Sequence, residues 1–541
     1  MKNKTVIIIL ALLAAAFWFA HVYVVRWDMT GDKRYSINER TQQLVRSLDA
    51  PMMMTLYLDG PLNPGFVRLR KAVLEMGEEL HTCQPLWNVQ AVDKSVNNDS
   101  MLLARGLTPT TIHERTQDGR MVQTTIWPYV ALTYHQRIVY VPLLHNNRGK
   151  SGEQNLNESI ENLEYALAEA MYSLVQEKTT KIAFLEGHGE LSEHSVWDIS
   201  TALARYFQID RGILGNDPAA LNDYRVVIIA DPQRPFSESD KYILDQYVMH
   251  GGRILWLVNG VRLDQDVLAS DGFSPVLPLD LHLADMFFTY GVRVEPTIVQ
   301  DVQCLSIPVD VSADRTQANY QPMPWFYAPL LLTSQYSPIT RNVGQISSSF
   351  VSHIEAVGND SLKRIILLAT STASRVIGTP TEVNLGELNP NLEDFRWQYL
   401  PVAMSVEGVF HSAFHHRMVP DSITLHERLL TSAPTKQIVV ATGSIIRNEW
   451  QHGKPLPVGY DRYSGMQFGN KEFLTNAVLY LADDLDLMEL RKKEIALRLI
   501  NDERAHEQRS VIQLLSIVLP IILLILASGI VIWRRKHKYT V

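Results

Sequence analysis

The sequence predicts an α/β protein with two membrane anchors and, between them, one flavodoxin-like or glutamine-amidotransferase-like parallel sheet. Two apolar stretches, at 5–25 and 511–533, are each long enough as a helix to span a hydrocarbon core of roughly 30 Å. Between them, short apolar runs alternate with patterns typical of amphipathic helices. That alternation indicates parallel strands covered by helices.

The charge around these stretches predicts the topology. A basic cluster from Arg534 to Lys538 follows the second stretch and indicates a cytoplasmic tail. Two crossings place both termini on that side and the bulk of the chain on the other. The first stretch has a competing interpretation as a cleaved signal peptide. Its apolar run continues to Val25 without a small-residue cleavage motif, which favours an uncleaved anchor.

Composition limits the class of protein. The chain has 541 residues and a net charge of −8, which predicts two or three folded domains and argues against a nucleic-acid partner. Its two cysteines, Cys83 and Cys304, are too far apart in sequence for a disulfide framework or a cysteine metal site, and we expect buried free thiols. The predicted segments are an anchor at 1–26, α/β regions at 27–178, 179–301 and 302–483, a juxtamembrane segment at 484–510, a transmembrane helix at 511–533 and a basic tail at 534–541.

The first region, 27–178, has a strand–helix–strand pattern. Residues 52–58 and 88–92 read as strands, and apolar residues three or four apart over 66–80 predict a helix between them. A βαβ unit of this kind makes a thioredoxin-like fold a candidate, although no CxxC motif accompanies it. Two more strands are expected at 124–133 and 137–143, and an amphipathic helix over 156–175 closes the region.

The second region, 179–301, carries the parallel-sheet pattern most clearly. Apolar strands are predicted at 181–186, 225–230 and 253–258, with helices after the first two. The third region, 302–483, is less regular. It contains a proline- and aromatic-rich stretch at 322–329 that reads as loop or edge structure. Its expected elements are strands at 364–369, 402–409 and 437–442 and a short helix from Asn470.

One turn is a candidate ligand site. Gly187, His188, Gly189 and Glu190 follow the first strand of the parallel sheet, at the edge where open α/β sheets hold ligands. The turn could cradle a ligand or position a base. The structural alternative, a tight strand-to-helix turn with glycines at positive φ, is favoured because no nucleophile stands beside it. We therefore predict no catalytic residues, no cofactor and no metal ligands.

Two other motifs are interpreted as surface structure. Gly149-Lys150-Ser151 resembles the end of a phosphate-binding loop but lacks its first glycine. The histidines at 411, 415 and 416 fall on a predicted strand and loop, where their rings would diverge rather than bind one metal ion.

The second apolar stretch has a less apolar side formed by Gln513, Ser516 and Pro520. A helix facing only lipid has little use for such residues, so they are predicted to contact another membrane subunit.

Several strings together resemble one family. They are RWDMTGDKRYSINERTQQLVRSLDAPMMMTLYLDGPLNPGFVRLRKAV at 26–73, ENLEYALAEAM at 161–171, KIAFLEGHGEL at 181–191, LPVGYDRYSGMQFGNKEFLTNAVLYLADD at 456–484 and LMELRKKEIALRLIN at 487–501. In combination the chain resembles the auxiliary component of the gliding-motility-associated ABC transporter, the GldG type. The resemblance implies a periplasmic body in the bacterial inner membrane beside a permease and a cytoplasmic ATPase, and it supplies no catalytic residues.

Two functions therefore compete. The favoured one is a non-catalytic accessory subunit that couples a permease and an ATPase to periplasmic substrate or envelope machinery, with a homodimer expected because permeases dimerise. The alternative is a membrane-tethered hydrolase or ligand-binding module that uses the turn from Gly187 to Glu190.

Overall fold

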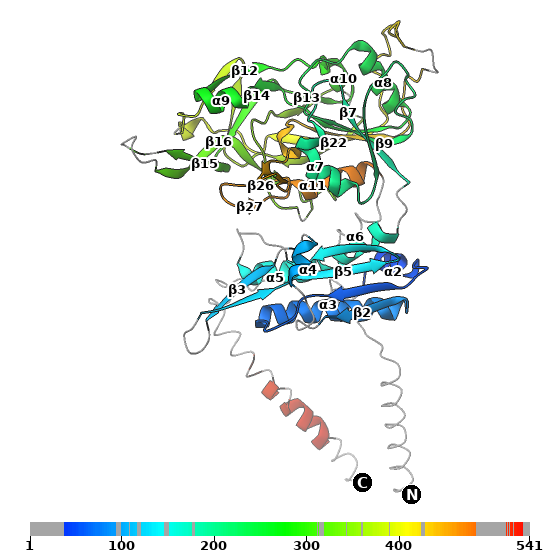
Figure 1. Ribbon diagram of the computed structural model, residues 1–541, viewed down its shortest axis with the longest axis vertical. Coiled ribbons are helices and arrows are strands. Elements are labelled where there is room, and N and C mark those ends of the chain that lie inside the picture. Colours follow the sequence, from blue (N-terminus) through cyan, green and yellow to red (C-terminus); the bar gives the residue numbers. More distant parts are fainter. Residues whose placement is uncertain are drawn as a thin grey trace. The chain divides into compact units, whose positions relative to one another are not determined.

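The computed structural model describes residues 37–482 and part of 516–533 (Figure 1). Within these ranges it leaves out 93–98, 106, 108, 116–120, 145–150, 176–178, 311, 313–318, 342, 359–360, 389, 424–427, 517, 519 and 523. The chain divides into two compact units, Met1–Tyr35 with Glu494–Val541, and Ser36–Lys493. The second unit holds all the sheets described below.

The predicted membrane anchors require a correction. The segment 1–26 lies outside the described residues, as do the juxtamembrane segment 484–510 and the tail 534–541. In the part of the chain that the structure describes, no helix has the length and apolar character needed to cross a bilayer. The two-anchor fold class and the inner-membrane localisation through two transmembrane helices were therefore wrong.

A four-stranded sheet, in the order β2-β1-β5-β6, forms the N-terminal part of the second unit. Strand β1 (Met52–Leu56) pairs in parallel with β2 (Trp87–Ala91), and α3 (Pro64–Cys83) connects them, which confirms the predicted strand–helix–strand pattern. Strands β5 (Tyr129–Tyr134) and β6 (Arg137–Pro142) complete the sheet as an antiparallel hairpin. A separate hairpin, β3 (Thr110–Arg115) and β4 (Met121–Ile126), precedes them.

Helix α3 lies close against this sheet. Asn63 caps it by accepting the backbone N–H of Phe66, and Pro64 stands in its first turn, where a missing N–H has no consequence. A Cβ added at Gly77 would come within 2.8 Å of Val89 Cγ2 and 3.1 Å of Met54 Cε. The absence of a side chain at this position therefore allows the helix to approach both parallel strands.

The helix predicted over 156–175 is two helices. Helix α5 (Gly152–Glu161) ends at Asn162, and α6 (Leu163–Val175) begins immediately after it. Ser151 and Gln154 form a capping box at the start of α5. Helix α6 also contacts α2 (Glu39–Arg46), where Glu164 accepts the Asn38 backbone N–H at 2.6 Å.

The main sheet is mixed, which corrects the predicted parallel sheet. Its main path runs β15-β16-β19-β22-β23-β10-β9-β7-β8, with β17 (Ile346–Ser347) paired to β16. The parallel strands are β7 (Lys181–Glu186), β8 (Gln208–Ile213), β9 (Tyr224–Ala230), β10 (Arg253–Leu257) and β23 (Thr435–Val440). The antiparallel strands are β15 (Cys304–Asp310), β16 (Tyr320–Thr333), β19 (Lys363–Ala369) and β22 (Pro401–Gly408). Local apolar runs reveal that strands exist, but the connections between strands decide their direction.

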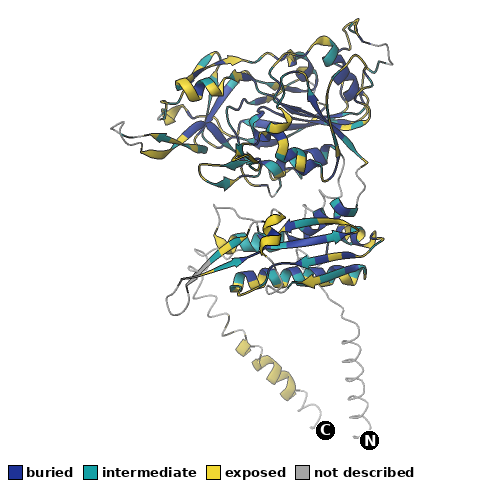
Figure 2. Ribbon diagram, viewed as in Figure 1, coloured by how far each residue is buried: buried dark blue, intermediate teal, exposed yellow. Residues whose placement is uncertain are grey.

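Helices cover this sheet and bury its central strands. Helix α11 (Asn470–Leu481) contacts β9, β10 and β23 and also α7 (Trp197–Leu203). Helix α8 (Glu238–Met249) contacts β10, and its Lys241 forms an ion pair at 2.9 Å with Asp285 of α10 (Ala284–Thr289). All five residues of β10 are buried, and dark blue marks the sheet interior in Figure 2. These strands and helices share one large hydrophobic core.

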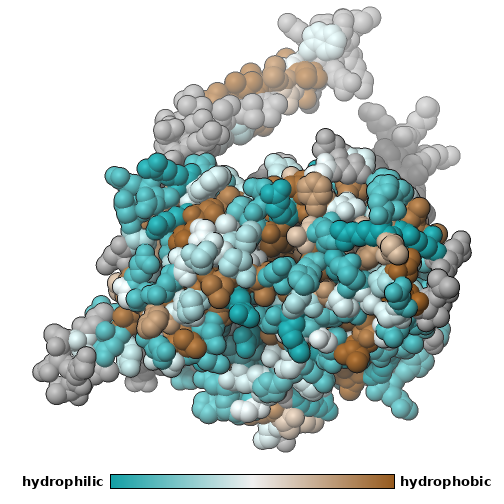
Figure 3. Space-filling view, turned by 90° about the horizontal axis from the view of Figure 1, so that it is seen from above, coloured by the Kyte–Doolittle hydropathy of each residue, from teal (hydrophilic) through white to brown (hydrophobic). Residues whose placement is uncertain are grey.

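Smaller sheets complete the unit. A three-stranded sheet contains β11 (Val261–Leu263), β12 (Phe273–Pro278) and β21 (Thr381–Asn384), with α9 (Gln265–Asp271) between its first two strands. Two-stranded ladders join β13 (Val292–Val294) to β18 (Ile354–Ala356) and β14 (Thr297–Asp301) to β20 (Ser374–Gly378). On the face shown in Figure 3, apolar patches are separated by hydrophilic residues.

The two cysteines are free thiols, each partly buried. Burial raises the pKa of both, and that of Cys304 reaches about 11, with the Asp301 carboxylate adding to the effect.

Candidate functional site at the carboxyl edge of the parallel strands

The candidate turn lies where the order of the parallel strands reverses. Strand β7 has β8 on one side and β9 on the other, so the chain leaves it in one direction and later returns on the other side. In open α/β sheets, ligand crevices form at such a switch point, outside the carboxyl ends of the strands. Gly187 follows β7 there, and Asp231 follows β9.

Two glycines give the turn its shape. Gly187 has φ of 119° and Gly189 has φ of 77°, both in the region that residues with a Cβ rarely adopt. A Cβ at Gly189 would also come within 3.2 Å of Gln233 Cβ, in the loop after β9. The turn therefore needs glycine for its backbone conformation and for its close approach to that loop.

His188 is buried between two carboxylates. It is 7% exposed, its Nδ1 lies 3.1 Å from Glu190 Oε1, and its Nε2 lies 3.2 Å from Asp240 Oδ2. Its ring stacks on Phe236 with a centroid distance of 3.7 Å. Glu190 comes from the turn itself, whereas Asp240 lies in the first turn of α8. The imidazole thus joins β7 to α8.

The charges around His188 decide its protonation. Burial lowers the pKa of the imidazole, but hydrogen bonds and charge–charge attraction from Glu190 and Asp240 outweigh it, and the net pKa is raised. A protonated imidazole donates from both nitrogens, which matches one carboxylate on each. A general base needs a free ring nitrogen facing a substrate, and both nitrogens of His188 are engaged.

The backbone of the turn is tied to the loop after β9. The carbonyl of His188 accepts the backbone N–H groups of Gln233 and Arg234, each at 2.8 Å. The N–H of His188 donates to Glu190 Oε2 at 2.6 Å. The candidate turn is therefore held by hydrogen bonds from its side chains and from its main chain.

Asp231 is the second acid at this edge, and it is half-buried. Its φ of 57° is left-handed, and its Oδ1 accepts Gln233 Nε2 at 2.9 Å and Asn259 Nδ2 at 2.6 Å. Burial raises the pKa of this carboxyl to about 6, against the opposing charge of Arg447. Loss of contact with water makes the charged carboxylate less stable than the neutral acid, and this raises the pKa.

The ends of β10 and β23 complete the edge. Asn259 follows β10, and its Oδ1 accepts the backbone N–H of Gly443, which follows β23, at 3.0 Å. A Cβ added to Gly443 would stand only 2.2 Å from Asp231 Cβ. Four parallel strands thus end in polar groups that bind one another across the edge. These hydrogen bonds join the loops to one another, so the polar groups at this edge already have partners within the protein.

Sequence reasoning located the turn but missed its partners. Asp231, Asp240, Asn259 and Gly443 were not predicted as residues of the site. The available signal was positional, because Asp231 comes directly after the apolar run RVVIIA and Asn259 directly after RILWLV. Polar residues at the carboxyl ends of neighbouring parallel strands meet at one edge.

The other predicted motifs lie elsewhere. His411, His415 and His416 are exposed, as expected, and the rings of the last two meet edge to face at 4.4 Å. Within the described ranges, no three residues among His, Cys, Asp and Glu are grouped so that they could hold a metal ion. Gln513 lies outside the described residues, whereas Ser516 and Pro520 are exposed and helical. Their contact with another subunit stays a prediction.

A family model described as an ABC-type uncharacterized transport system matches residues 179–477, and a domain of unknown function matches 31–133. Among solved structures, the chain is similar to the mmIFT52 N-terminal domain, at 13% identity and a TM-score of 0.34, over 56% of this chain and 97% of that one. It is also similar to a beta-galactosidase from Rahnella sp. R3, at 11% identity and a TM-score of 0.26, over 62% of this chain and 35% of that one. At these TM-scores neither structure bears on function.

Proposed function

The chain belongs to the family of ABC-type transport-system auxiliary components, and from that premise we propose that it is a non-catalytic subunit that works beside a permease and an ATPase. The match to residues 179–477 carries the proposal, because it spans the whole mixed sheet and the carboxyl edge of its parallel strands. The role in transport is accessory. The chain assists a transport system whose energy comes from another subunit.

The geometry of the carboxyl edge supports a structural role for the turn from Gly187 to Glu190. Both ring nitrogens of His188 face carboxylates, and Asp231 accepts two amide donors. Groups in such a network orient the loops that carry them. A general acid or base instead needs a side-chain atom that is free to form a hydrogen bond with the substrate. We accordingly assign the edge to shaping the protein rather than to turnover.

The resemblance to gliding-motility-type components narrows the proposal. We infer that the partners are one permease and one ATPase of that type, with two copies of the chain in the complex because permeases of ABC systems act as dimers.

Affinity purification from the native host tests this function. A tagged chain, extracted with detergent under mild conditions, should retain a permease and an ATPase in stable proportion through size exclusion, as identified by mass spectrometry. The matched control is an unrelated chain with the same tag at the same expression level. Recovery of the chain with neither subunit, in the same extract in which the permease and ATPase purify together, would refute the proposal.

A further inference from the structure

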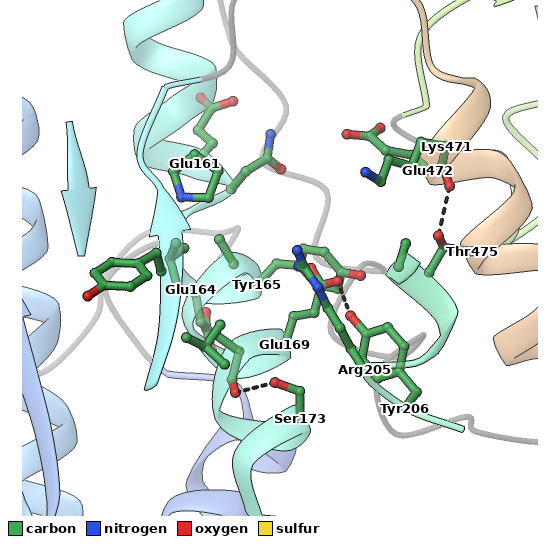
Figure 4. Close-up of a pocket in the computed structure, with 18 residues that line it drawn as sticks. Glu161, Glu164, Tyr165, Glu169, Ser173, Arg205, Tyr206, Lys471, Glu472 and Thr475 are labelled. Carbon is green, nitrogen blue, oxygen red and sulfur yellow. Dashed lines mark hydrogen bonds between the residues drawn. The ribbon is translucent and has the colours of Figure 1, made fainter. Parts of the chain in front are cut away.

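A cavity of about 400 Å³ lies beside α6, away from the carboxyl edge (Figure 4). Its walls come from β6, from α6 and the residues before it, from the end of α7 and from the first turns of α11. Pockets for small molecules range over roughly 300–1,000 Å³, so this cavity is large enough for a ligand of a few heavy atoms to a dipeptide.

Much of the polar lining already forms hydrogen bonds or ion pairs within the protein. Glu164 accepts the Asn38 backbone N–H at 2.6 Å and the Thr41 hydroxyl at 2.9 Å. The Tyr206 hydroxyl donates to Glu169, and Lys471 pairs with Asp198 at 2.8 Å. These contacts hold the walls of the cavity in place.

Three polar side chains in the lining are not committed. Among the residues that the structure describes, the side chains of Arg205, Glu472 and Asn162 have no hydrogen-bond or ion-pair partner. Arg205 follows α7 and Glu472 lies in the first turn of α11, and both are exposed, whereas Asn162 lies between α5 and α6 and is half-buried. A cation and an anion therefore line one cavity without pairing with each other.

The view into the cavity shows how these groups are arranged. Arg205 lies beside Glu169 and Tyr206, while Glu472 lies with Lys471 on the α11 side (Figure 4). Tyr165 and Ala166 of α6 supply apolar surface. The open space thus has a guanidinium on one part of its wall, a carboxylate on another and an amide that can donate or accept.

We propose that this cavity binds a small zwitterion that carries one carboxylate and one ammonium group, of the free amino-acid or dipeptide class. The ligand carboxylate binds Arg205, whose planar guanidinium offers paired N–H donors, and the ligand ammonium binds Glu472. The Asn162 amide bonds to either end. A ligand with a single charge satisfies only one of the two opposite charges in the wall, and its affinity is correspondingly lower. This binding is independent of the proposed transport partners.

Calorimetric titration of the full chain tests the proposal with L-alanine and L-alanyl-L-alanine. At least one of them should bind, and ethylamine and propionate, which each keep one of the two charges, should bind at least about 10-fold more weakly. Arg205→Gln and Glu472→Gln should each weaken zwitterion binding about 10- to 100-fold, as expected for one charge-assisted hydrogen-bonded pair.

Matched controls separate this effect from general surface charge. Arg262→Gln and Glu382→Gln change exposed residues outside the cavity and should bind as the unaltered chain does, with unchanged thermal unfolding in all four variants. The proposal is overturned if neither zwitterion gives heat at millimolar concentration. It is also overturned if ethylamine or propionate binds equally well, or if the two cavity variants keep full affinity.

Discussion

Glu190 binds His188 twice. One carboxylate oxygen accepts the His188 backbone N–H at 2.6 Å, and the other lies 3.1 Å from Nδ1 of the same residue. A side chain two positions along the chain thus closes the turn after β7 and fixes the orientation of the imidazole. Asp240, which lies in α8, contacts the other ring nitrogen, Nε2.

Removing the charge of Glu190 should destabilise the fold. Glu190→Gln replaces one carboxylate oxygen by an amide group that cannot accept a hydrogen bond. The buried donor left behind costs about 1–3 kcal/mol in the free energy of unfolding. Urea unfolding followed by circular dichroism measures this loss. Glu193→Gln, at an exposed residue three positions away, is the matched control and should change stability by less than about 0.5 kcal/mol. Equal stability of both variants would contradict the structural role of the turn.

The raised pKa of His188 predicts a pH dependence of stability. Because the folded-state pKa lies above the unfolded value of 6.5, the stabilisation is fully present below pH 6.5 and is lost as pH rises through the folded-state pKa. The free energy of unfolding should fall over that window in the unaltered chain and fall less in His188→Gln. Nuclear magnetic resonance titration of the imidazole locates the folded-state pKa, and a value at or below 6.5 would contradict the prediction.

Asp231 should lower stability at neutral pH. Its pKa rises from 3.8 unfolded to about 6 folded, so its favourable contribution is present below pH 3.8 and is lost as pH rises toward and through about 6. Asp231→Asn keeps an acceptor for Gln233 and Asn259 and tolerates the left-handed φ. This variant should gain about 1–3 kcal/mol at pH 7.5. Little gain is expected at pH 4. An Asn variant less stable than the unaltered chain at pH 7.5 would show that the charged form is supported, with Arg447 as the candidate cause.

Gly443 should not tolerate a side chain. In Gly443→Ala the new Cβ would overlap Asp231 Cβ at 2.2 Å, so the loops after β9 and β23 would have to separate. Overpacking of this kind destabilises by about 1–3 kcal/mol or more. Thermal unfolding measures the loss. Gly215→Ala, where an added Cβ meets nothing within 4 Å, is the control and should melt like the unaltered chain.

Both thiols should react slowly with alkylating agents at neutral pH. The thiolate is the reactive form, and burial raises the pKa of Cys83 and raises that of Cys304 to about 11. Iodoacetamide labelling followed by peptide mass spectrometry should show slower modification of Cys304 than of free cysteine, and full modification of both thiols in urea. Rapid labelling of Cys304 in the folded chain would contradict its burial.

Local sequence pattern predicted individual elements better than their assembly. The apolar runs at 181–186, 225–230 and 253–258 correspond to β7, β9 and β10, and the pattern over 66–80 corresponds to α3. The stretch at 322–329 lies inside the fourteen-residue strand β16, although its prolines favoured a loop or an edge. In the fold, β16 pairs with β15 and with β17. Neither partner can be recognised from the local sequence of β16.

The sequence predicted where the candidate site lies but not which residues form it. Glycines at 187 and 189 marked a turn at a sheet edge, but Asp240 and Gly443 reach that edge from distant parts of the chain. The residues of the cavity beside α6 also come from distant parts of the chain. Arg205 and Glu472 line the same cavity because α7 packs against α11. Periodicity cannot show which surface residues will face one another after folding. The apolar stretches at the two ends illustrate a different error, because composition alone predicted membrane-spanning helices, and among the described residues no helix is long and apolar enough to cross a bilayer.

The pairing of β10 with β23 has a consequence for synthesis on the ribosome. Strand β10 ends at Leu257 and β23 begins at Thr435. The ribosome must therefore translate a further 435 − 257 = 178 residues before β23 can begin to cover this side of β10. At roughly 5–20 residues per second, the nascent chain presents a largely apolar strand edge for about 10–35 seconds. Such an edge is a template for unwanted strand pairing until the segment that forms β23 has emerged.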